Sequence, residues 1–339
     1  MKFAVGYQIP QNGERFSEIV RTYKEHIKEV YFSWPGMASG RPQSLGHVWY
    51  AQQRLEEELM AIRKMGIKLD LLLNANCYGA DAISNAIKKE IIGLLEYLAA
   101  HGCCPEIVTT ASPYLAHILK EECPLIEIRA SVNMRIGTIQ ALEYASEYFD
   151  SFYFQRDYQR NIKYVREVHE WCEEHQKKLC VLANSGCLRF CPSQTFHDNL
   201  IAHSQEAETK SNLDWNPHLC RKVYSDKEHF VDILKSTWIR PEDIRKYDGL
   251  VDVVKLATRQ HSHPRMVIGA YSSGNFDGNL LELLEPGFAT QFFPYYIENK
   301  NFPTDWQEKS GSCLGGCTNC GYCETVLEQV LGNFNEIIT

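Results

Sequence analysis

Strand-length hydrophobic runs alternate with helical segments along almost the whole chain, and this alternation constrains the fold more than any other feature. Eight such runs, rich in Val, Ile, Leu and Phe, are separated by segments with helical periodicity. Parallel neighbouring strands need a long crossover, usually a helix, so the pattern predicts a parallel sheet buried on both faces. Eight β–α units favour an α/β protein of the closed (β/α)8, TIM-like barrel type over an open doubly wound sheet.

The expected elements follow from periodicity and from turn residues. We expect strands at Lys2–Tyr7, Glu29–Trp34, Ile67–Asn74, Glu106–Ser112, Ile126–Asn133, Ser151–Gln155, Lys178–Asn184 and Leu250–Leu256. The clearest helices are expected at Leu45–Met65, Asp81–Ala100, Thr138–Tyr148 and Asn161–His175. A chain of 339 residues then holds a barrel domain at 1–285, with an inserted cysteine loop at 185–225, and a C-terminal cysteine-rich extension at 286–339.

Composition narrows the classes of function. Hydrophobic residues make up 44% of the chain and charged residues 23%, which is typical of a globular protein. The net charge of −8 excludes a generally basic nucleic-acid coat but leaves room for a local basic pocket. No apolar run approaches the ~20 residues of a membrane span. Because the first residues turn polar too early for a secretory signal, we expect a cytoplasmic protein, of an oligomeric state that the sequence does not indicate.

In such a barrel the chemistry lies just past the C-terminal ends of the strands. Asn184, Lys255 and Arg259 follow or end the last two strands and are candidate catalytic residues, and Arg240 is a further one that could point into the mouth. Lys255 and Arg259 place two cations where barrels often bind anions, so a small anionic substrate or donor is expected. Solvated or ion-paired cations are the alternative, and Arg240 also begins an ordinary capped helix. Other rim positions carry Gln8, Ser33, Trp34, Asn74, Asn76, Cys77, Ser112, Asn133, Arg135, Arg156 and Asp157.

The motifs of common hydrolases are missing from the sequence. It contains no Gly-x-Ser-x-Gly elbow, no His-Glu-x-x-His and no phosphate-binding Gly-x-x-x-x-Gly-Lys loop. Only one of the rim positions is a carboxylate, so a pair of acids for glycoside hydrolysis is not apparent.

Thirteen cysteines in a reducing compartment indicate metal ligation or thiol chemistry more than disulfides. Cys187 and Cys191 follow the seventh strand directly, and Cys220 lies in the same long connection. These three predict a soft-metal site, although the Cys-x3-Cys pair could also be coincidence. Cys180 is one candidate for a fourth ligand, with a tail cysteine, Cys77 or an open iron as the competing answers. The remaining cysteines are expected to be small buried hydrophobes: Cys77, Cys103, Cys104, Cys123 and Cys172.

The tail holds four cysteines within eleven residues, Cys313, Cys317, Cys320 and Cys323. Thiolates this close repel one another unless a cation neutralises them, which indicates a metal. Four cysteines fit either tetrahedral zinc or an iron–sulfur cluster, and both interpretations stay open. The tail could also be a metal-stapled knuckle without a part in catalysis.

Two histidines follow the cysteine pair on an expected helix. His197 and His203 are six residues apart and do not share a helix face, so a two-histidine metal site is not expected. Each is expected to cap or pack.

These residues together resemble the U32 peptidase family. The resemblance is carried by Leu182-Ala-Asn-Ser-Gly-Cys-Leu188 with Cys191-Pro192 and His197, similar to the family's Asn-Glu-Gly-Cys-Leu…Cys-Pro…His segment. Further blocks resemble the family at Ile239–Asp243, Lys255–Arg259 and Gly278–Leu281, and the likeness is strongest from about Arg156 to Leu284.

The resemblance implies a TIM-like barrel and, as in several members, a [4Fe–4S] cluster, here on Cys187, Cys191 and Cys220 with Cys180 as a less certain fourth ligand. Related members carry out oxygen-independent hydroxylation of RNA bases or quinone precursors with prephenate as donor, while others are assigned peptidase activity. The expected function is therefore cluster-dependent hydroxylation of RNA or a small molecule. The alternatives are a peptidase and a non-catalytic metal protein that binds a partner.

This chain departs from the hydroxylase pattern at one place. The hydroxylase-type members have Gly-Ala-Leu-Cys…Ser-Gly-Arg-Cys, where this sequence has Lys178-Leu-Cys180…Ser185-Gly-Cys187. The two cysteines keep their offset, but the glycine and the arginine do not keep their places.

Overall fold

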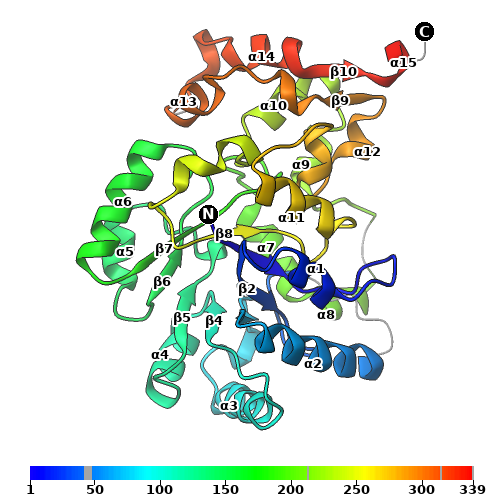
Figure 1. The fold of residues 1–339 in the computed structure, drawn as a ribbon. Coiled ribbons are helices and arrows are strands. Elements are labelled where there is room, and N and C mark those ends of the chain that lie inside the picture. Colours follow the sequence, from blue (N-terminus) through cyan, green and yellow to red (C-terminus); the bar gives the residue numbers. More distant parts are fainter. Residues whose placement is uncertain (42–47, 212–213, 314, 338–339) are drawn as a thin grey trace.

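The chain folds into a closed barrel of eight parallel strands (Figure 1). The structure is a computed structural model and describes residues 1–41, 48–211, 214–313 and 315–337. The strands neighbour one another in sequence order, and β1 closes the barrel against β8 through the pair Phe3 and Val254. The expected TIM-like barrel is confirmed. The strands are β1 (Phe3–Gly6), β2 (Ile27–Phe32), β3 (Lys68–Leu73), β4 (Ile107–Thr110), β5 (Glu127–Ala130), β6 (Ser151–Tyr153), β7 (Lys178–Leu182) and β8 (Val253–Leu256).

Most of the observed strands end before the end of the hydrophobic run that predicts them. Residues just past the strands leave the ladder because their side chains bond to the loops at the mouth. Asn74, for example, accepts a hydrogen bond from the backbone N–H of Gly40 at 2.9 Å. Ser131 caps a short turn that carries Asn133, with its hydroxyl accepting from the Asn133 N–H.

Helices surround the barrel, and several of their N-termini carry the caps that the sequence provides. The side chains of Ser84, Ser112, Thr138 and Asn161 each accept a backbone N–H in the first turn of a helix. The expected helix at Leu45–Met65 begins outside the described residues and is described from Val48. The helices on the barrel wall are α1 (Phe16–Thr22), α2 (Val48–Lys64), α3 (Asn85–Ala100), α4 (Pro113–Glu122), α5 (Ile139–Ala145), α6 (Ile162–Glu174) and α11 (Pro264–Ser273).

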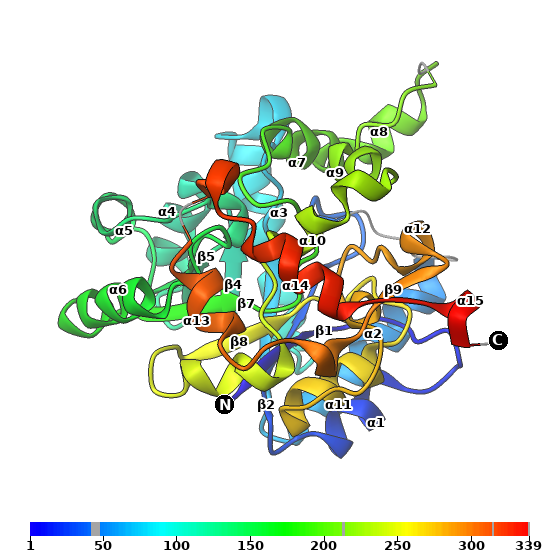
Figure 2. The same ribbon diagram turned by 90° about the horizontal axis from the view of Figure 1, so that it is seen from above.

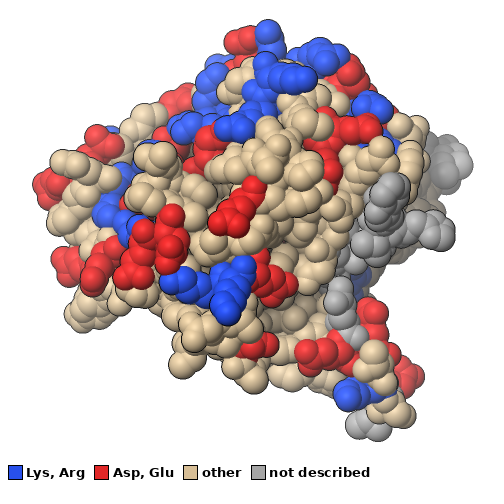
Figure 3. All heavy atoms as spheres, turned by 90° about the horizontal axis from the view of Figure 1, so that it is seen from below, with Lys and Arg blue, Asp and Glu red and all other residues tan. Residues whose placement is uncertain are grey.

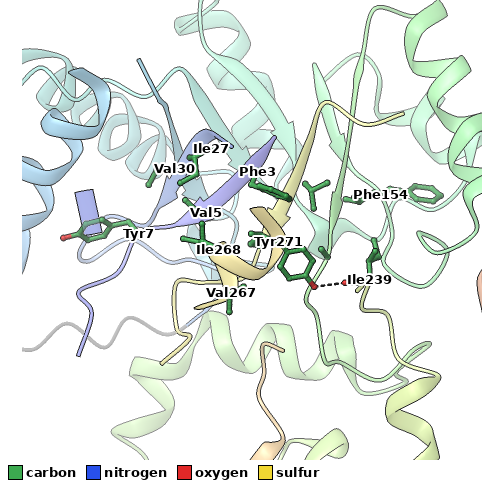
Figure 4. Close-up of a cluster of buried hydrophobic side chains, with 14 of the residues drawn as sticks. Phe3, Val5, Tyr7, Ile27, Val30, Phe154, Ile239, Val267, Ile268 and Tyr271 are labelled. Atoms are coloured by element: carbon green, nitrogen blue, oxygen red, sulfur yellow. Dashed lines mark hydrogen bonds between the residues drawn. The ribbon is translucent and has the colours of Figure 1, made fainter. Parts of the chain in front are cut away.

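The main hydrophobic core lies between the strands and these helices. Figure 4 shows Phe3 and Val5 of β1 facing Val267, Ile268 and Tyr271 of α11. The Tyr271 hydroxyl donates to the backbone carbonyl of Ile239 at 2.6 Å, which satisfies its one polar group inside the core.

The barrel interior, in contrast, contains charge. Arg129 of β5 is fully buried and makes a two-pronged ion pair with Glu29 of β2 on the other side of the barrel. Asp70 of β3 lies 3.9 Å from the same guanidinium and accepts a hydrogen bond from Thr109 at 2.8 Å. The interior of this barrel is therefore held in part by a buried ionic network and not only by aliphatic layers.

In its described part, the long connection between β7 and β8 carries four α-helices and covers part of the barrel mouth. These helices are α7 (Gln194–Ala202), α8 (Ser204–Glu208), α9 (Leu219–Val223) and α10 (Val231–Leu234). Among the described residues no helix is long and apolar enough to cross a membrane. On the face shown in Figure 3, Lys and Arg side chains are interspersed with Asp and Glu side chains.

The C-terminal segment crosses one side of the molecule (Figures 1 and 2). It contains α12 (Ala289–Phe292), α13 (Trp306–Gly311), α14 (Tyr322–Val330) and α15 (Phe334–Ile337), and its strands β9 (Tyr295–Ile297) and β10 (Leu331–Asn333) pair antiparallel. Trp306 of α13 is fully buried and belongs to the same core as the barrel strands. Gly311 packs so closely on the barrel that a Cβ there would lie 2.2 Å from the carbonyl oxygen of Arg160. The extension is thus packed onto the barrel and does not stand apart from it.

Candidate active site at the mouth of the barrel

A cavity of about 110 Å³ lies at the C-terminal end of the strands. Its walls come from the ends of β2, β3, β7 and β8, from the cysteine loop and from α7 and α9. Three cysteines that sequence analysis grouped together, Cys187, Cys191 and Cys220, line it with His197. The remaining polar wall residues include Arg41, Asn74, Asn133, Arg156, Ser185, Gln194, Asp198, His218, Lys255, Arg259, Gln260 and Glu285.

Cys187 is the cysteine that its surroundings favour as a thiolate. Burial by itself raises the pKa of this thiol, but the guanidinium groups of Arg156 and Arg41 outweigh burial and lower it. Arg156 is held in place because it also donates to the Ser185 hydroxyl at 3.0 Å. A half-buried thiol whose pKa is lowered by two neighbouring cations is more reactive, and a better metal ligand, than an inert core cysteine.

Cys191 and Cys220 are favoured as neutral thiols when no cation is bound. Burial raises the pKa of Cys191, and the nearby Cys187 raises it further. The pKa of Cys220 rises to about 11, mainly through burial and then through Cys187. Three thiolates in one cavity would therefore repel one another, and a bound metal would have to displace two protons.

His197 shares the cavity wall and has an unsatisfied nitrogen. Its Nε2 is buried and has no hydrogen-bond partner among the described residues, and its ring lies 4.7 Å from the ring of His218, centroid to centroid. Burial, followed by the charge of Arg41, lowers the pKa of His197 to about 4, so the imidazole is neutral at pH 7. The sequence predicts that His197 only caps or packs. It does not predict that His197 lines the cavity, because the spacing of residues along a helix does not show which other segments the helix faces.

The donor set suits a soft metal, with one restriction. Sulfur and neutral imidazole are ligands for zinc and for iron–sulfur clusters, and the orphaned Nε2 of His197 provides a fourth donor on the same wall. Within the described residues, however, no group of three or more His, Cys, Asp or Glu side chains is arranged to hold a single metal ion. What the structure shows is that the three cysteines line one cavity together.

Positive charge dominates the rest of the cavity. Four cationic side chains line it, Arg41, Arg156, Lys255 and Arg259, against two carboxylates, Asp198 and Glu285. Arg259 donates to the Ser39 hydroxyl and to the Arg41 carbonyl, each at 3.2 Å, and so holds the segment that ends at residue 41 against the mouth. The excess of cations suits an anionic ligand.

Lys255 forms the cationic floor of the cavity. Its side chain is largely buried, and its ammonium nitrogen lies between two aromatic rings, 4.0 Å from the centroid of Tyr31 and 5.0 Å from that of Tyr153. Burial lowers the pKa of Lys255, Asp70 opposes this effect, and Arg259 reinforces it. Lys255 and Arg259, which the sequence predicts as an anion-binding pair, therefore line the same cavity.

Two of the expected catalytic residues do not line the cavity. Asn184 is fully buried, and its amide donates to the carbonyls of Ala257 and Leu283 and accepts from the Ala257 N–H, so it fastens β7 to the loop after β8. Arg240 is wrong as a mouth residue: it pairs with Asp243 at 3.0 Å and donates to the Asn299 carbonyl. Its helix-start position makes that local carboxylate available, which is the ordinary role that the sequence also allowed.

Cys180 is wrong as a fourth ligand. It is fully buried on β7 inside the barrel, where it packs with Tyr153 and Val253 below the cavity. Leu182, two residues further along the strand, is the residue of β7 that reaches the cavity wall. Side chains on one face of a strand recur every second residue, so Cys180 lies one layer below Leu182 and does not reach the cavity.

The four tail cysteines line a second cavity, of about 620 Å³, between the extension and the cysteine loop. Cys191 and Leu188 contact both cavities. The two cysteine groups of the sequence are therefore neighbours across the segment 188–191.

A thiol–imidazole pair at the rim was not expected from the sequence. Cys77, just past β3, lies beside His203 at the end of α7, and this imidazole is the main reason that the pKa of Cys77 is lowered. The Gly79 N–H donates to the Cys77 sulfur at 3.4 Å, and His203 Nδ1 lies 3.6 Å from a Glu206 oxygen. Cys103 and Cys172, in contrast, are buried, as expected of small hydrophobes.

Comparison with known proteins shows which of them this chain resembles. No protein-family model matches the chain. The uncharacterized protease MJ1657 of Methanocaldococcus jannaschii is 26% identical over 325 residues, covering 94% of this chain and 92% of the relative. The solved structure of the U32 peptidase Mk0906 has the same fold, with a TM-score of 0.53 and 15% identity over 75% of this chain and 92% of that one. The chain is thus similar to a curated protease over nearly its whole length and has the fold of a U32 peptidase, and its Asn184–Leu188 segment at the mouth resembles that family.

Proposed function

We propose that the barrel mouth is the active site of a metal-centre enzyme, with a [4Fe–4S] cluster held by Cys187, Cys191 and Cys220. The observation that carries the proposal is that these three thiols line one cavity together with cations. His197, whose buried Nε2 lacks a partner among the described residues, is the fourth ligand in this proposal and replaces Cys180. The cluster would supply redox or oxygen-transfer chemistry beside the bound substrate.

The residues of the chain would bind and orient a carboxylate ligand. Lys255 and Arg259 line the same cavity as the cysteines, and charge-assisted hydrogen bonds to a carboxylate can form there. Arg156 and Arg41 would balance the negative charge of the thiolates. The low exposure of Lys255 excludes most water from this contact and so strengthens it.

The reaction that we propose is oxygen-independent hydroxylation with a small anionic donor such as prephenate. The acceptor is a small molecule or an RNA base. The cavity of about 110 Å³ is smaller than the roughly 300–1,000 Å³ typical of sites that enclose a drug-sized ligand. The mouth segments would therefore have to open to admit donor and acceptor together, and binding of RNA would weaken with salt because phosphate contacts release counterions.

Anaerobic purification tests the proposal. The wild-type protein should be brown, absorb near ~400 nm and contain iron and acid-labile sulfide in equal amounts, as Fe–S ligation by cysteine requires. The C187S/C191S variant should lose the share of iron bound at the mouth, while C123S, which changes a cysteine outside both cavities, should keep it. Zinc in place of iron at the mouth would overturn the redox proposal.

A peptidase is the second candidate, and the Cys77–His203 pair favours it. In this mechanism the Cys77 thiolate attacks a peptide carbonyl carbon, the C–N bond breaks as the His203 imidazolium donates its proton to the leaving amine, and water then hydrolyses the thioester. Glu206 would orient the imidazole through Nδ1. Each proton and electron pair in this sequence of steps is supplied by the chain or by water.

Peptide hydrolysis measured before and after removal of iron separates the two candidates. Hydrolysis that survives iron removal and is lost in C77S, but not in C104S, would support the peptidase and contradict the cluster as the catalytic group. Absence of hydrolysis in iron-loaded and iron-free protein alike would contradict the peptidase role of Cys77.

A further inference from the structure

The tail cavity is built as a site of its own. Cys313 follows α13, Cys317 and Cys320 flank a short turn, and Cys323 lies in the first turn of α14. All four line one cavity of about 620 Å³, which Arg160 from the barrel side also lines. The site therefore exists only where the extension is packed on the barrel.

Arg160 is a buried cation without a carboxylate partner among the described residues. Its Nη1 donates to the Leu234 carbonyl at 3.1 Å, and its guanidinium carbon lies 5.5 Å from the ring centroids of both Trp238 and Trp306. Burial and then the charge of Arg189 lower the pKa of Arg160 to about 10, against the opposing effects of Cys323, Tyr247 and Cys313. An anionic group in the cavity would compensate this charge, because a buried charge is stable only when it is paired.

The donor arrangement distinguishes between the two metals that four cysteines can bind. A zinc site needs sulfurs converging tetrahedrally at ~2.3 Å from one ion. Among the described residues no group of three or more ligand side chains is arranged to hold a metal ion, while all four tail cysteines line one cavity of about 620 Å³. In a cluster each thiolate binds a different iron, so its four cysteines line a space and need not converge on one point.

We propose that Cys313, Cys317, Cys320 and Cys323 bind a second [4Fe–4S] cluster, with Arg160 as its buried counter-charge. The two cavities share Cys191 and Leu188, so only the segment 188–191 separates this cluster from the mouth. Cys317 and Cys320 are exposed, so the outer edge of the cluster faces solvent.

This placement suggests a role for the tail cluster that rests on the proposed function: it would relay electrons from the mouth to the surface. In this reaction the C–O bond of the donor breaks, the dehydroxylated donor is released as a product, and its oxygen is transferred at the oxidation level of water. Replacement of the acceptor's C–H bond by C–OH then releases two electrons together with protons. The electrons would pass one at a time through the tail cluster to an external one-electron carrier, an iron–sulfur or flavin protein, at the exposed edge. The protons would leave to solvent.

Metal analysis of anaerobically purified variants tests the site without an activity assay. We expect C317S/C320S to lose half of the iron and half of the sulfide of the wild type, and C187S/C191S to lose the other half. C104S, which changes a partly buried cysteine outside both cavities, should lose none. Because Cys317 and Cys320 are exposed, folding should survive, and far-ultraviolet circular dichroism checks this.

The outcomes separate this proposal from the previous one. Stoichiometric zinc that disappears in C317S/C320S, or an iron content that this variant does not change, would overturn the tail cluster. Iron that is lost in C317S/C320S but unchanged in C187S/C191S would support the tail cluster while contradicting the mouth cluster. The electron paramagnetic resonance spectrum of dithionite-reduced protein should show two interacting clusters in the wild type and one isolated cluster in C317S/C320S and in C187S/C191S.

Discussion

The ammonium nitrogen of Lys255 lies 4.0 Å from the centre of the Tyr31 ring, at the floor of the mouth cavity. The ring face stabilises the cation without neutralising it. Lys255 forms no ion pair within 4.0 Å among the described residues, and its charge is available to a ligand that enters the cavity.

Replacement of Lys255 should therefore weaken anion binding. With malonate and prephenate as probes, K255M should lower the affinity about ten- to a hundredfold, because a charge-assisted hydrogen bond contributes roughly 1.5–3 kcal/mol. Isothermal titration calorimetry measures this effect. K300M is the control and should bind as the wild type does, since Lys300 lies on the surface and pairs there with Asp277 at 2.8 Å.

The same contact predicts a pH dependence. Burial lowers the pKa of Lys255 from its ordinary value of about 10.4, so the ammonium loses its proton at a lower pH than an exposed lysine does. Anion affinity should therefore fall as the solution is made alkaline, and the fall should begin below the ordinary lysine pKa. K255M should lack this fall, and an identical pH profile in wild type and K255M would contradict the assignment.

Much of the barrel can be predicted from the sequence, because buried parallel strands are continuous hydrophobic runs and several helices start at a capping residue. The charged interior cannot be predicted in this way. Glu29 and Arg129 lie on strands that do not neighbour each other, and only closure of the barrel brings them together.

Loss of Arg129 should destabilise the fold. R129M leaves the buried carboxylate of Glu29 without its partner, and breaking a buried pair costs about 3–5 kcal/mol. The free energy of unfolding, measured by denaturant titration, should fall by this amount. R166M, on the exposed face of α6, should change it by less than about 0.5 kcal/mol. Equal stability of the two variants would show that the network contributes nothing.

The candidate site, too, can be predicted from the sequence only in part. Cys187, Cys191 and Cys220 can be grouped from the sequence because they follow one strand within one connection. Asn184 and Arg240 cannot be excluded from the mouth on that basis, because their hydrogen bonds reach Leu283 and Asn299, far along the chain. His197 becomes a candidate ligand only when the structure shows its unpaired nitrogen on the cavity wall.

Close packing at Gly311 gives a test of how the extension docks. In G311A the new Cβ would meet the Arg160 carbonyl oxygen at 2.2 Å, and overpacking of this kind costs about 1–3 kcal/mol. Limited trypsin digestion should release tail peptides faster than in the wild type. G316A is the matched control, since nothing lies within 4 Å of a Cβ at that position. Equal cleavage of both variants would contradict the close docking.

The rim thiol should be unusually reactive. Because the neighbouring His203 lowers the pKa of Cys77, iodoacetamide should modify Cys77 at a lower pH than a free cysteine with a pKa of about 8.5. Peptide mapping by mass spectrometry should show Cys77 modified before Cys104, whose pKa burial raises. H203A should slow the modification of Cys77 and leave that of Cys104 unchanged. A rate at Cys77 that does not depend on His203 would contradict the pairing.

A metal centre at the mouth is tested most directly by Mössbauer spectroscopy of anaerobic protein reconstituted with iron-57 and sulfide. The wild type should show the signal of a [4Fe–4S] cluster that disappears in the C187S/C191S/C220S variant while the signal of the tail cluster remains. A wild-type spectrum without any cluster signal that depends on these three cysteines would contradict the centre at the mouth.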